Sequence, residues 1–275
     1  MFRYPGGKIR LMKKINKIII SSYPNLLFKD IKILDCFVGG GGSLINMAKD
    51  FPNSVFYLND LNPEIYTFWK FFHKASLKDI YDFMSKIKET DPTIDSYFEM
   101  FASKPENDFD MAFKILFLNK TSYNGVVIQP SPIGGKNQTG KWKVGCYWNK
   151  KRISDNVLKA YHLLNGRIIS VTNVDYKEVL RNDANKYDLI YADPPYIKHG
   201  KEWYGINFGI EHFHDMMDTL GNLESNVAVS IDNDKEILNT IYPNFETNII
   251  DVVYSAKSSK MKNIERNKEL VFIKR

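Results

Sequence analysis

The amino-acid sequence predicts an α/β fold, with a seven-stranded, mostly parallel sheet and an inserted, mainly helical domain. Three observations lead to this expectation. Short apolar runs rich in β-branched residues recur along the chain, and segments with the apolar spacing of a helix separate most of them. This alternation stops over one long central stretch. Alternating strands and helices are typical of a parallel sheet that helices cover on both faces.

The expected strands are short runs of four to eight apolar and β-branched residues, bounded by turn-forming residues. They span residues 31–36, 54–58, 167–171, 187–191, 226–231, 247–253 and 270–274. The helices expected between them have apolar residues three and four positions apart. These helices span residues 9–20, 43–51, 211–223 and 235–241.

The alternation fails between Leu61 and Leu164. Helical patterns over residues 65–73, 77–88 and 110–118 follow one another there, and a loop rich in Gly, Pro, Asn and Lys succeeds them. We therefore expect one domain formed by residues 1–62 and 151–275, which contains the sheet. Residues 63–150 are expected to form a second, inserted domain.

Composition bounds the kind of protein. Of the 275 residues, 44% are hydrophobic and 25% are charged, which is typical of a folded chain. Residues 1–10 carry three basic side chains and no apolar run, so neither a signal peptide nor a membrane span is expected, and a cytoplasmic location is the default. Cys36 and Cys146 lack neighbours at metal-ligand spacing, so we expect neither a disulfide nor a metal site.

The positive charge is concentrated in one segment. Residues 115–154 contain no acid and account for all of the net charge of +6. The basic residues of this segment are Lys120, Lys136, Lys141, Lys143, Lys150, Lys151 and Arg152. Such a segment suits a polyanion, because each neutralised phosphate releases counterions. A solvated loop surface is the alternative.

A glycine-rich turn follows the first expected strand. Asp35, Cys36, Phe37 and Val38 precede four consecutive glycines, and a helix starts at once. Glycines allow the backbone to pass close to a ligand where open α/β sheets bind nucleotides. Asp60 ends the second strand nineteen residues past Gly41, where a carboxylate can accept both ribose hydroxyls. Leu44 stands where a dinucleotide fingerprint needs glycine, so the pattern predicts adenosine without pyrophosphate; a plain tight turn is the alternative.

The motif Asp193-Pro194-Pro195-Tyr196 follows the fourth expected strand. Two prolines cannot continue a ladder, so the chain must turn out at the carboxyl edge of the sheet, where ligands bind. An aromatic amine is a poor nucleophile, and acceptors for its two hydrogens draw the nitrogen towards a tetrahedral shape. The Asp193 carboxylate and the Pro194 carbonyl suit this role, and Tyr196 suits stacking on an extruded base. A helix-capping Asp before a rigid turn is the alternative.

Together these blocks resemble the D12 class of adenine-specific DNA methyltransferases, the family of the bacterial Dam methylases. The resemblance runs almost end to end, through residues 2–8, 37–41, 58–62, 116–125 and 193–196. It implies a Rossmann-like class I methyltransferase that moves the methyl group of S-adenosyl-L-methionine to the exocyclic N6 amine of a flipped-out adenine, with S-adenosyl-L-homocysteine as product and no metal. Double-stranded DNA is the implied partner, and a cognate restriction endonuclease is left open.

The resemblance also assigns residues to three roles. The catalytic set is Asp193, Pro194, Pro195 and Tyr196. The cofactor-binding set is Tyr4, Lys8, Phe37, Gly39, Gly41, Asp60, Asp175, Tyr176 and Asp193. The DNA-binding set is Tyr123, Asn124 and the seven basic residues named above. Residues 63–150 are then the target-recognition domain, inserted into a catalytic domain.

The chain departs from the Dam pattern after Gly125. Dam enzymes that recognise GATC carry an arginine shortly after this position, suited to grip guanine, whereas Val126, Val127, Ile128 and Gln129 stand here, so GATC specificity is not carried over. Two alternatives stay open, a methyltransferase of the same fold for an RNA or protein amine and an inactive DNA-binding relative. Of the four aromatic residues among the lysines, we expect at least two to pack in the core. These are Tyr123, Trp142, Tyr147 and Trp148.

Overall fold

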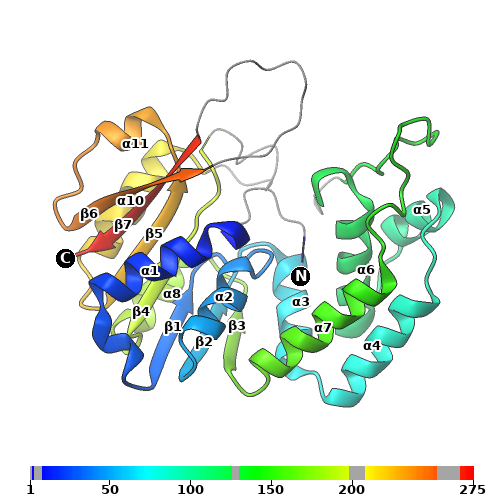
Figure 1. The fold of residues 1–275 in the computed structure, drawn as a ribbon, viewed down its shortest axis with the longest axis horizontal. Helices are drawn as coiled ribbons and strands as arrows, with labels where there is room; N and C mark the ends of the chain where they lie inside the picture. Colours follow the sequence, from blue (N-terminus) through cyan, green and yellow to red (C-terminus); the bar gives the residue numbers. More distant parts are fainter. Residues whose placement is uncertain (1, 3–7, 126–129, 198–207, 253–266) are drawn as a thin grey trace.

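A seven-stranded sheet forms the centre of the protein in this computed structural model, which describes residues 2, 8–125, 130–197, 208–252 and 267–275 (Figure 1). The strands are β1 (Ile31–Asp35), β2 (Ser54–Asn59), β3 (Ile168–Thr172), β4 (Leu189–Ala192), β5 (Asn226–Asp232), β6 (Phe245–Val252) and β7 (Asn267–Lys274). Their order in the sheet is β3-β2-β1-β4-β5-β7-β6. Strands β1 to β5 pair in parallel, and β7 lies antiparallel between β5 and β6. The predicted α/β class and the seven strands are confirmed.

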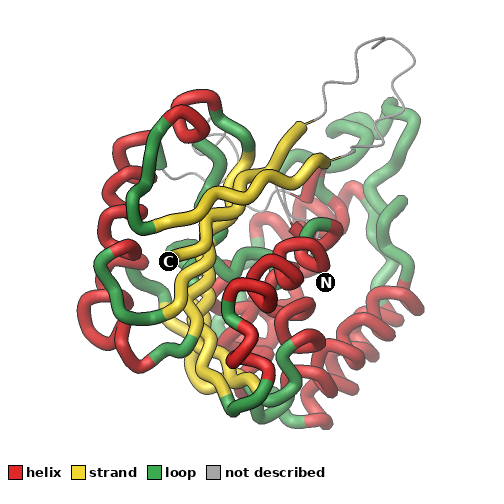
Figure 2. Tube along the Cα trace, turned by 60° about the vertical axis from the view of Figure 1, so that its left-hand side comes forward, coloured by secondary structure: helices red, strands yellow, loops and turns green. Residues whose placement is uncertain are grey.

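Helices cover both faces of the sheet (Figures 1 and 2). Their bounds are α1 (Met12–Ser22), α2 (Gly42–Asp50), α3 (Pro63–Lys74), α4 (Leu77–Glu89), α5 (Ile94–Ala102), α6 (Asp108–Thr121), α7 (Lys150–Leu164), α8 (Tyr176–Asp183), α10 (Ile210–Gly221) and α11 (Lys235–Asn239). Short 3-10 turns lie at Lys8–Arg10, Pro24–Leu27, Tyr123–Gly125 and Ala184–Lys186. Within the described ranges, no helix is both long and apolar enough to cross a membrane.

Alternate strand residues supply two hydrophobic cores. Ile33 belongs to the core that includes residues of helices α1 to α7, while its neighbour Leu34 belongs to the core that includes residues of α8, α10 and α11. This division follows from the strand period, because successive side chains point to opposite faces of a sheet. The parallel strands are buried on both faces, as the unbroken burial of β4 shows.

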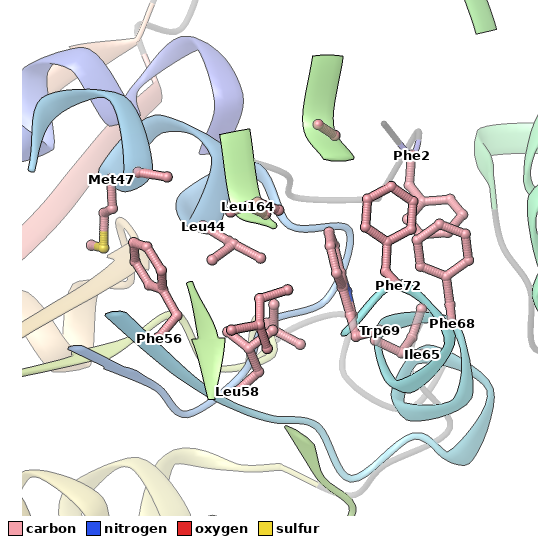
Figure 3. Packing of buried hydrophobic residues seen from close by; sticks show 14 of the residues in the cluster. Phe2, Leu44, Met47, Phe56, Leu58, Ile65, Phe68, Trp69, Phe72 and Leu164 are labelled. Atoms are coloured by element: carbon pink, nitrogen blue, oxygen red, sulfur yellow. The ribbon is translucent and has the colours of Figure 1, made fainter. Parts of the chain in front are cut away.

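The central stretch forms the helices α3 to α6, which pack in the same core as one face of the sheet. Aromatic side chains dominate this region. Phe68 of α3 lies 4.3 Å from the Phe2 ring, centroid to centroid, and Trp69 lies 5.8 Å from Phe72 (Figure 3). Helix α7, which follows residues 63–150, packs against both α4 and α2. The helices of this central stretch are therefore joined to the sheet by a continuous apolar core.

Candidate active site

The glycine turn after β1 is held in a conformation that only glycine adopts easily. Gly39 and Gly41 have φ values of +47° and +69°. The indole Nε1 of Trp69 donates a hydrogen bond of 2.9 Å to the Gly39 carbonyl. A Cβ atom on Gly41 would lie 2.1 Å from Cζ2 of Trp69. Trp69 of the inserted region thus fixes the turn, and the turn brings bare backbone to the edge of the sheet.

Asp60 closes the same turn from the end of β2. Its Oδ2 accepts from the Gly39 N–H at 2.8 Å, and its Oδ1 accepts from the Asn62 N–H at 2.9 Å. Burial raises the pKa of Asp60 to about 6, although these two hydrogen bonds work in the opposite direction. A carboxylate has about four acceptor sites, so each oxygen keeps a lone pair for a ligand hydroxyl.

Two aromatic rings lie beside the turn. The Phe37 and Tyr176 rings are 5.4 Å apart, centroid to centroid, and Tyr176 is buried. Asp175 accepts a hydrogen bond of 2.9 Å from the Lys177 N–H and is the N-cap of α8. The structure therefore gives Asp175 a helix-capping role, and it brings Phe37 and Tyr176 together as one apolar surface.

Asp193 stands at the carboxyl end of β4. Pro194 and Pro195, which follow it, are buried, so the turn that carries the carboxylate is fixed by packing. The Asp193 side chain is 20% exposed and lies 3.3 Å from the Nζ of Lys8. Burial raises the pKa of Asp193 to about 6, against the opposing effects of Lys8 and of a hydrogen bond with Ser230. The group is therefore charged at neutral pH and accessible from one side.

Lys8 connects the reactive motif to the far end of the chain. Its Nζ donates to the Tyr196 hydroxyl at 2.8 Å and forms ion pairs with Asp193 and Glu269. Burial acts to lower the pKa of Lys8, but attraction to Asp193 and Glu269 outweighs it and raises the pKa well above the ordinary value. Tyr196 is itself buried, with its ring centroid 4.3 Å from the Lys8 Nζ. The motif Asp193–Tyr196 and Lys8 thus form one largely buried cluster.

Three residues of this edge were missed by sequence analysis. Asp35 is buried, accepts from the Ser43 hydroxyl at 2.5 Å, and has its pKa raised to about 7 by burial. Ser230 contacts both Asp193 and the Tyr191 hydroxyl, the latter at 2.7 Å. Glu269 is 1% exposed on β7. Asp35 and Glu269 could have been found from the sequence, because each is an acid in an apolar strand run. No feature of the sequence pointed to Ser230.

The predicted DNA-binding residues are spread over a surface rather than gathered in a pocket. Lys136, Lys141 and Arg152 are exposed, and Lys143 donates to the Gln138 carbonyl. Lys120 is partly exposed. Some lysines of the acid-free segment nevertheless form ion pairs, because acids from outside the segment contact Lys150 and Lys151. Lys150 lies 2.7 Å from Asp91, and Lys151 lies 2.8 Å from Asp155.

The expectation that at least two of the four aromatic residues pack in the core was wrong. Trp148 is buried against Phe117 and donates to the Thr90 carbonyl at 3.0 Å. Tyr123, Trp142 and Tyr147 are exposed by 66%, 62% and 49%. The error arose because exposed aromatic residues carry the same sequence signal as aromatic residues of the core.

Two predicted positions cannot be placed. Tyr4 lies outside the described residues, and so does the side chain of Asn124. The backbone of Asn124 belongs to the short turn Tyr123–Gly125, directly after α6. Among the described residues, no three His, Cys, Asp or Glu side chains are grouped so that they could hold a metal ion.

The fold defines a class of protein, an α/β protein with a glycine turn after β1, an acid after β2 and the motif Asp193–Tyr196 after β4, all at the carboxyl edge of the sheet. Residues 4–267 match the family of D12 class N6 adenine-specific DNA methyltransferases. The chain belongs to this family. It is thus an adenine-specific DNA methyltransferase that uses S-adenosyl-L-methionine and acts on DNA.

Relatives of the chain include Type II methyltransferases. M.CviBI of Paramecium bursaria Chlorella virus NC1A is 25% identical over 209 residues, covering 76% of this chain and 73% of the relative. M.MjaIII of Methanocaldococcus jannaschii is 23% identical over 207 residues, covering 70% and 68%. Among solved structures, the rRNA methyltransferase aviRa from Streptomyces viridochromogenes is similar with a TM-score of 0.44 at 12% identity, covering 98% of this chain and 86% of that one.

The residues at the sheet edge fit the cofactor that this family uses. The positive φ values at Gly39 and Gly41 turn the backbone sharply at the end of β1, where open α/β sheets bind nucleotides. Asp60 offers spare acceptor sites for hydroxyls, and the Phe37 and Tyr176 rings offer an apolar surface for a base. Each of these features suits one part of a nucleoside.

Proposed function

We propose that this protein is a site-specific enzyme that methylates an adenine flipped out of duplex DNA, with Asp193 and the Pro194 carbonyl accepting the two hydrogens of the target amine. The observation that carries the proposal is the Asp193 carboxylate, fixed at the end of β4 by Lys8 and Ser230 and still 20% exposed. Bound S-adenosyl-L-methionine supplies an electrophilic methyl group on a sulfonium. The chain must then make the amine nucleophilic and align it.

Asp193 performs the first task in this proposal. The lone pair of an adenine amine is delocalised into the ring, and hydrogen bonds to a carboxylate and a carbonyl favour the tetrahedral nitrogen that attack needs. Since the pKa of Asp193 is raised only to about 6, the carboxylate is charged at neutral pH. It can therefore accept hydrogen bonds and, once the nitrogen has gained its methyl group, the proton that the nitrogen loses.

The remaining motif residues are assigned positioning and stacking roles. Buried Pro194 and Pro195 hold the turn, and we assign base stacking to Tyr196. For cofactor binding, we assign the ribose to Asp60, the base to Phe37 and Tyr176, and close backbone approach to the turn at Gly39 and Gly41. Tyr4, Lys8 and Asp175 complete the proposed cofactor set.

DNA docking is assigned to the region 63–150, as an insertion into a catalytic domain of residues 1–62 and 151–275. Exposed Lys136 and Lys141 are suited to phosphate contacts, and exposed Tyr123 and Trp142 are suited to the stack that a flipped base leaves open. We also propose that the protein is located in the cytoplasm. Because its relatives include Type II methyltransferases, we propose a cognate restriction endonuclease as a partner.

Single-turnover methyl transfer to a random-sequence plasmid, with modified adenines mapped by sequencing, tests the catalytic proposal. Asp193→Ala should lower the transfer rate by a factor on the order of 10² to 10³, while S-adenosyl-L-methionine still binds. Asp193→Asn is the isosteric control for lost charge alone, and it should also lose transfer. A rate of Asp193→Ala within about tenfold of the parent, or about 1.4 kcal/mol, would refute the assignment. Cofactor binding by the parent protein without transfer to any DNA would indicate an inactive relative.

A further inference from the structure

Glu269 is a buried carboxylate that none of the sequence motifs includes. It lies on β7 directly opposite Asp232, the last residue of β5, because these two strands pair antiparallel. This register brings Glu269 to the carboxyl edge of the sheet, where Asp193 stands. A glutamate that is 1% exposed needs a partner, and its partner is Lys8.

The Lys8 ammonium forms ion pairs with two carboxylates, those of Asp193 and Glu269. It has three N–H donors, and the structure places three acceptors around it, the Tyr196 hydroxyl at 2.8 Å, Glu269 and the Oδ1 of Asp193 at 3.3 Å. The distance to Asp193 exceeds the 2.7 to 2.9 Å that is usual for a charge-assisted hydrogen bond. Lys8 is therefore close to Asp193 without forming a tight pair with it.

This arrangement matters because Asp193 has competing tasks. A carboxylate that binds a buried ammonium through short hydrogen bonds has fewer lone pairs for a substrate amine, and its electron density is drawn to the cation. Without Glu269, Asp193 would be the one anion that Lys8 contacts among the described residues, and the two would pair closely. With Glu269, the ammonium has a second anionic partner.

We propose that Glu269 is a positioning residue that holds the Lys8 ammonium back from Asp193 and so leaves the Asp193 carboxylate available to the target amine. The inference rests on the role proposed above for Asp193. The inference adds Glu269, which acts through Lys8 and lies on a strand that is distant in sequence from every motif.

The electrostatics of the cluster agree with this division. Burial raises the pKa of Glu269 to about 7, while attraction to Lys8 acts to lower it. Asp193 and Asp232 act on Glu269 in the same direction as burial. The charged and titratable groups that surround the Lys8 ammonium are Asp193, Tyr196 and Glu269. Glu269 is therefore fully charged only above about pH 7, and there the one Lys8 cation faces two carboxylates.

The first test is Glu269→Gln, which keeps the shape of the side chain and removes its charge. We expect the single-turnover methyl-transfer rate to fall at least tenfold, with the dissociation constant of S-adenosyl-L-methionine within threefold of the parent value. Glu246→Gln is the matched control, because Glu246 lies exposed on β6, in the strand pair that also contains Glu269. The control should change neither quantity. A Glu269→Gln rate within twofold of the parent overturns the proposal.

A pH profile separates positioning from packing. Because the pKa of Glu269 is raised to about 7, the parent carboxyl is charged above pH 7 and mostly protonated near pH 6. The rate deficit of Glu269→Gln should therefore be largest at pH 8 and become small near pH 6, where the parent side chain is also neutral. A purely structural defect lowers the rate by the same factor at every pH, and such a uniform deficit overturns the proposal.

A double-mutant cycle tests whether Glu269 acts through Lys8. In the Lys8→Met background, Glu269→Gln should cause no further loss of rate, since the ammonium that Glu269 restrains is gone. A further loss equal to that in the parent overturns the proposal. Should Glu269→Gln fail to fold, Glu269→Asp keeps the charge and must retain most of the parent rate at pH 8, and a loss of tenfold or more there overturns the proposal. Transfer by Asp193→Asn would instead refute the proposed role of Asp193, so the two failures are distinguishable.

Discussion

The sheet edge around Lys8 and the basic segment of residues 115–154 both depend on charge, but they hold it differently. At the edge, one lysine and several acids are buried, and the groups touch across strands that are distant in sequence. In the basic segment, Lys136 and Lys141 are exposed, and the ion pairs of Lys150 and Lys151 are exposed at one or both partners. Buried charges fix a geometry, whereas exposed charges supply attraction that salt screens.

This contrast teaches which residues can be replaced without cost to the fold. A change at the edge alters packing, hydrogen bonding and pKa values together, because each group has several buried partners. A change on the basic surface alters the electrostatic potential at that surface and has little effect on packing or stability. The four predictions below test the contrast, from the largest expected effect to the smallest.

The largest effect is expected from Gly41→Ala. Its Cβ would lie 2.1 Å from Trp69 at a φ of +69°, so the side chain meets both a fixed ring and a strained backbone. We expect a loss of roughly 2–4 kcal/mol in the free energy of unfolding, with loss of cofactor binding.

The matched control is Gly135→Ala, in the basic segment. Gly135 has a φ of +75°, but a Cβ there meets nothing within 4 Å. Urea unfolding should show a loss of only about 1 kcal/mol from backbone strain. Equal losses in the free energy of unfolding of the two variants would mean that the Trp69 ring moves aside for the new Cβ atom and does not fix the turn.

The second effect concerns the affinity for S-adenosyl-L-methionine. Asp60→Ala removes the carboxylate proposed for the ribose and should weaken binding by roughly 1.5–3 kcal/mol. Asp60→Asn keeps one acceptor oxygen and should lose less. Isothermal calorimetry on the folded variants measures both. An unchanged dissociation constant in Asp60→Ala would place the ribose elsewhere.

The third effect is a gain in stability that depends on pH. Because the pKa of Asp193 is raised above its unfolded value of 3.8 to about 6, its favourable contribution to folding is present at low pH and lost as pH rises through 6. Asp193→Asn stays neutral and should raise the free energy of unfolding by about 1–3 kcal/mol at pH 8, with a smaller gain at pH 4.5.

Denaturant titrations at the two pH values measure this gain. Exposed Asp30→Asn, on the loop before β1, is the control and should show no such pH-dependent gain. An Asp193→Asn variant that is less stable than the parent at pH 8 would show that its contacts with Lys8 and Ser230 outweigh the cost of burying the charge.

The smallest effect belongs to the basic surface. The double variant Lys136→Gln and Lys141→Gln should weaken binding to all duplexes alike, and each lost phosphate contact lowers the slope of log affinity against log salt by about 0.9. Lys150→Gln with Lys151→Gln should change the slope less, since Asp91 and Asp155 already pair with these lysines. Equal slopes in the parent and the first double variant would assign the charges to a solvated surface.

Much of this protein could be predicted from its sequence because the signals are local. The seven strands follow from short apolar runs, and the motif at Asp193 follows from prolines that end a strand. The turn at Gly41 follows from a glycine run, because glycine readily adopts the positive φ values found at Gly39 and Gly41. The family resemblance depends on the same short blocks, and the family match over residues 4–267 agrees with it.

The sequence by itself determined the α/β class, the strands and the motifs, because the periodicity of apolar residues and the chemistry of Gly and Pro act over a few positions. Only the tertiary structure decided the partners. It paired Lys8 with Glu269, buried Trp148 and gave Lys150 and Lys151 acidic neighbours. Periodicity indicates which face of an element is buried, but the group that meets a side chain there depends on how distant segments pack, and that is a property of the whole fold.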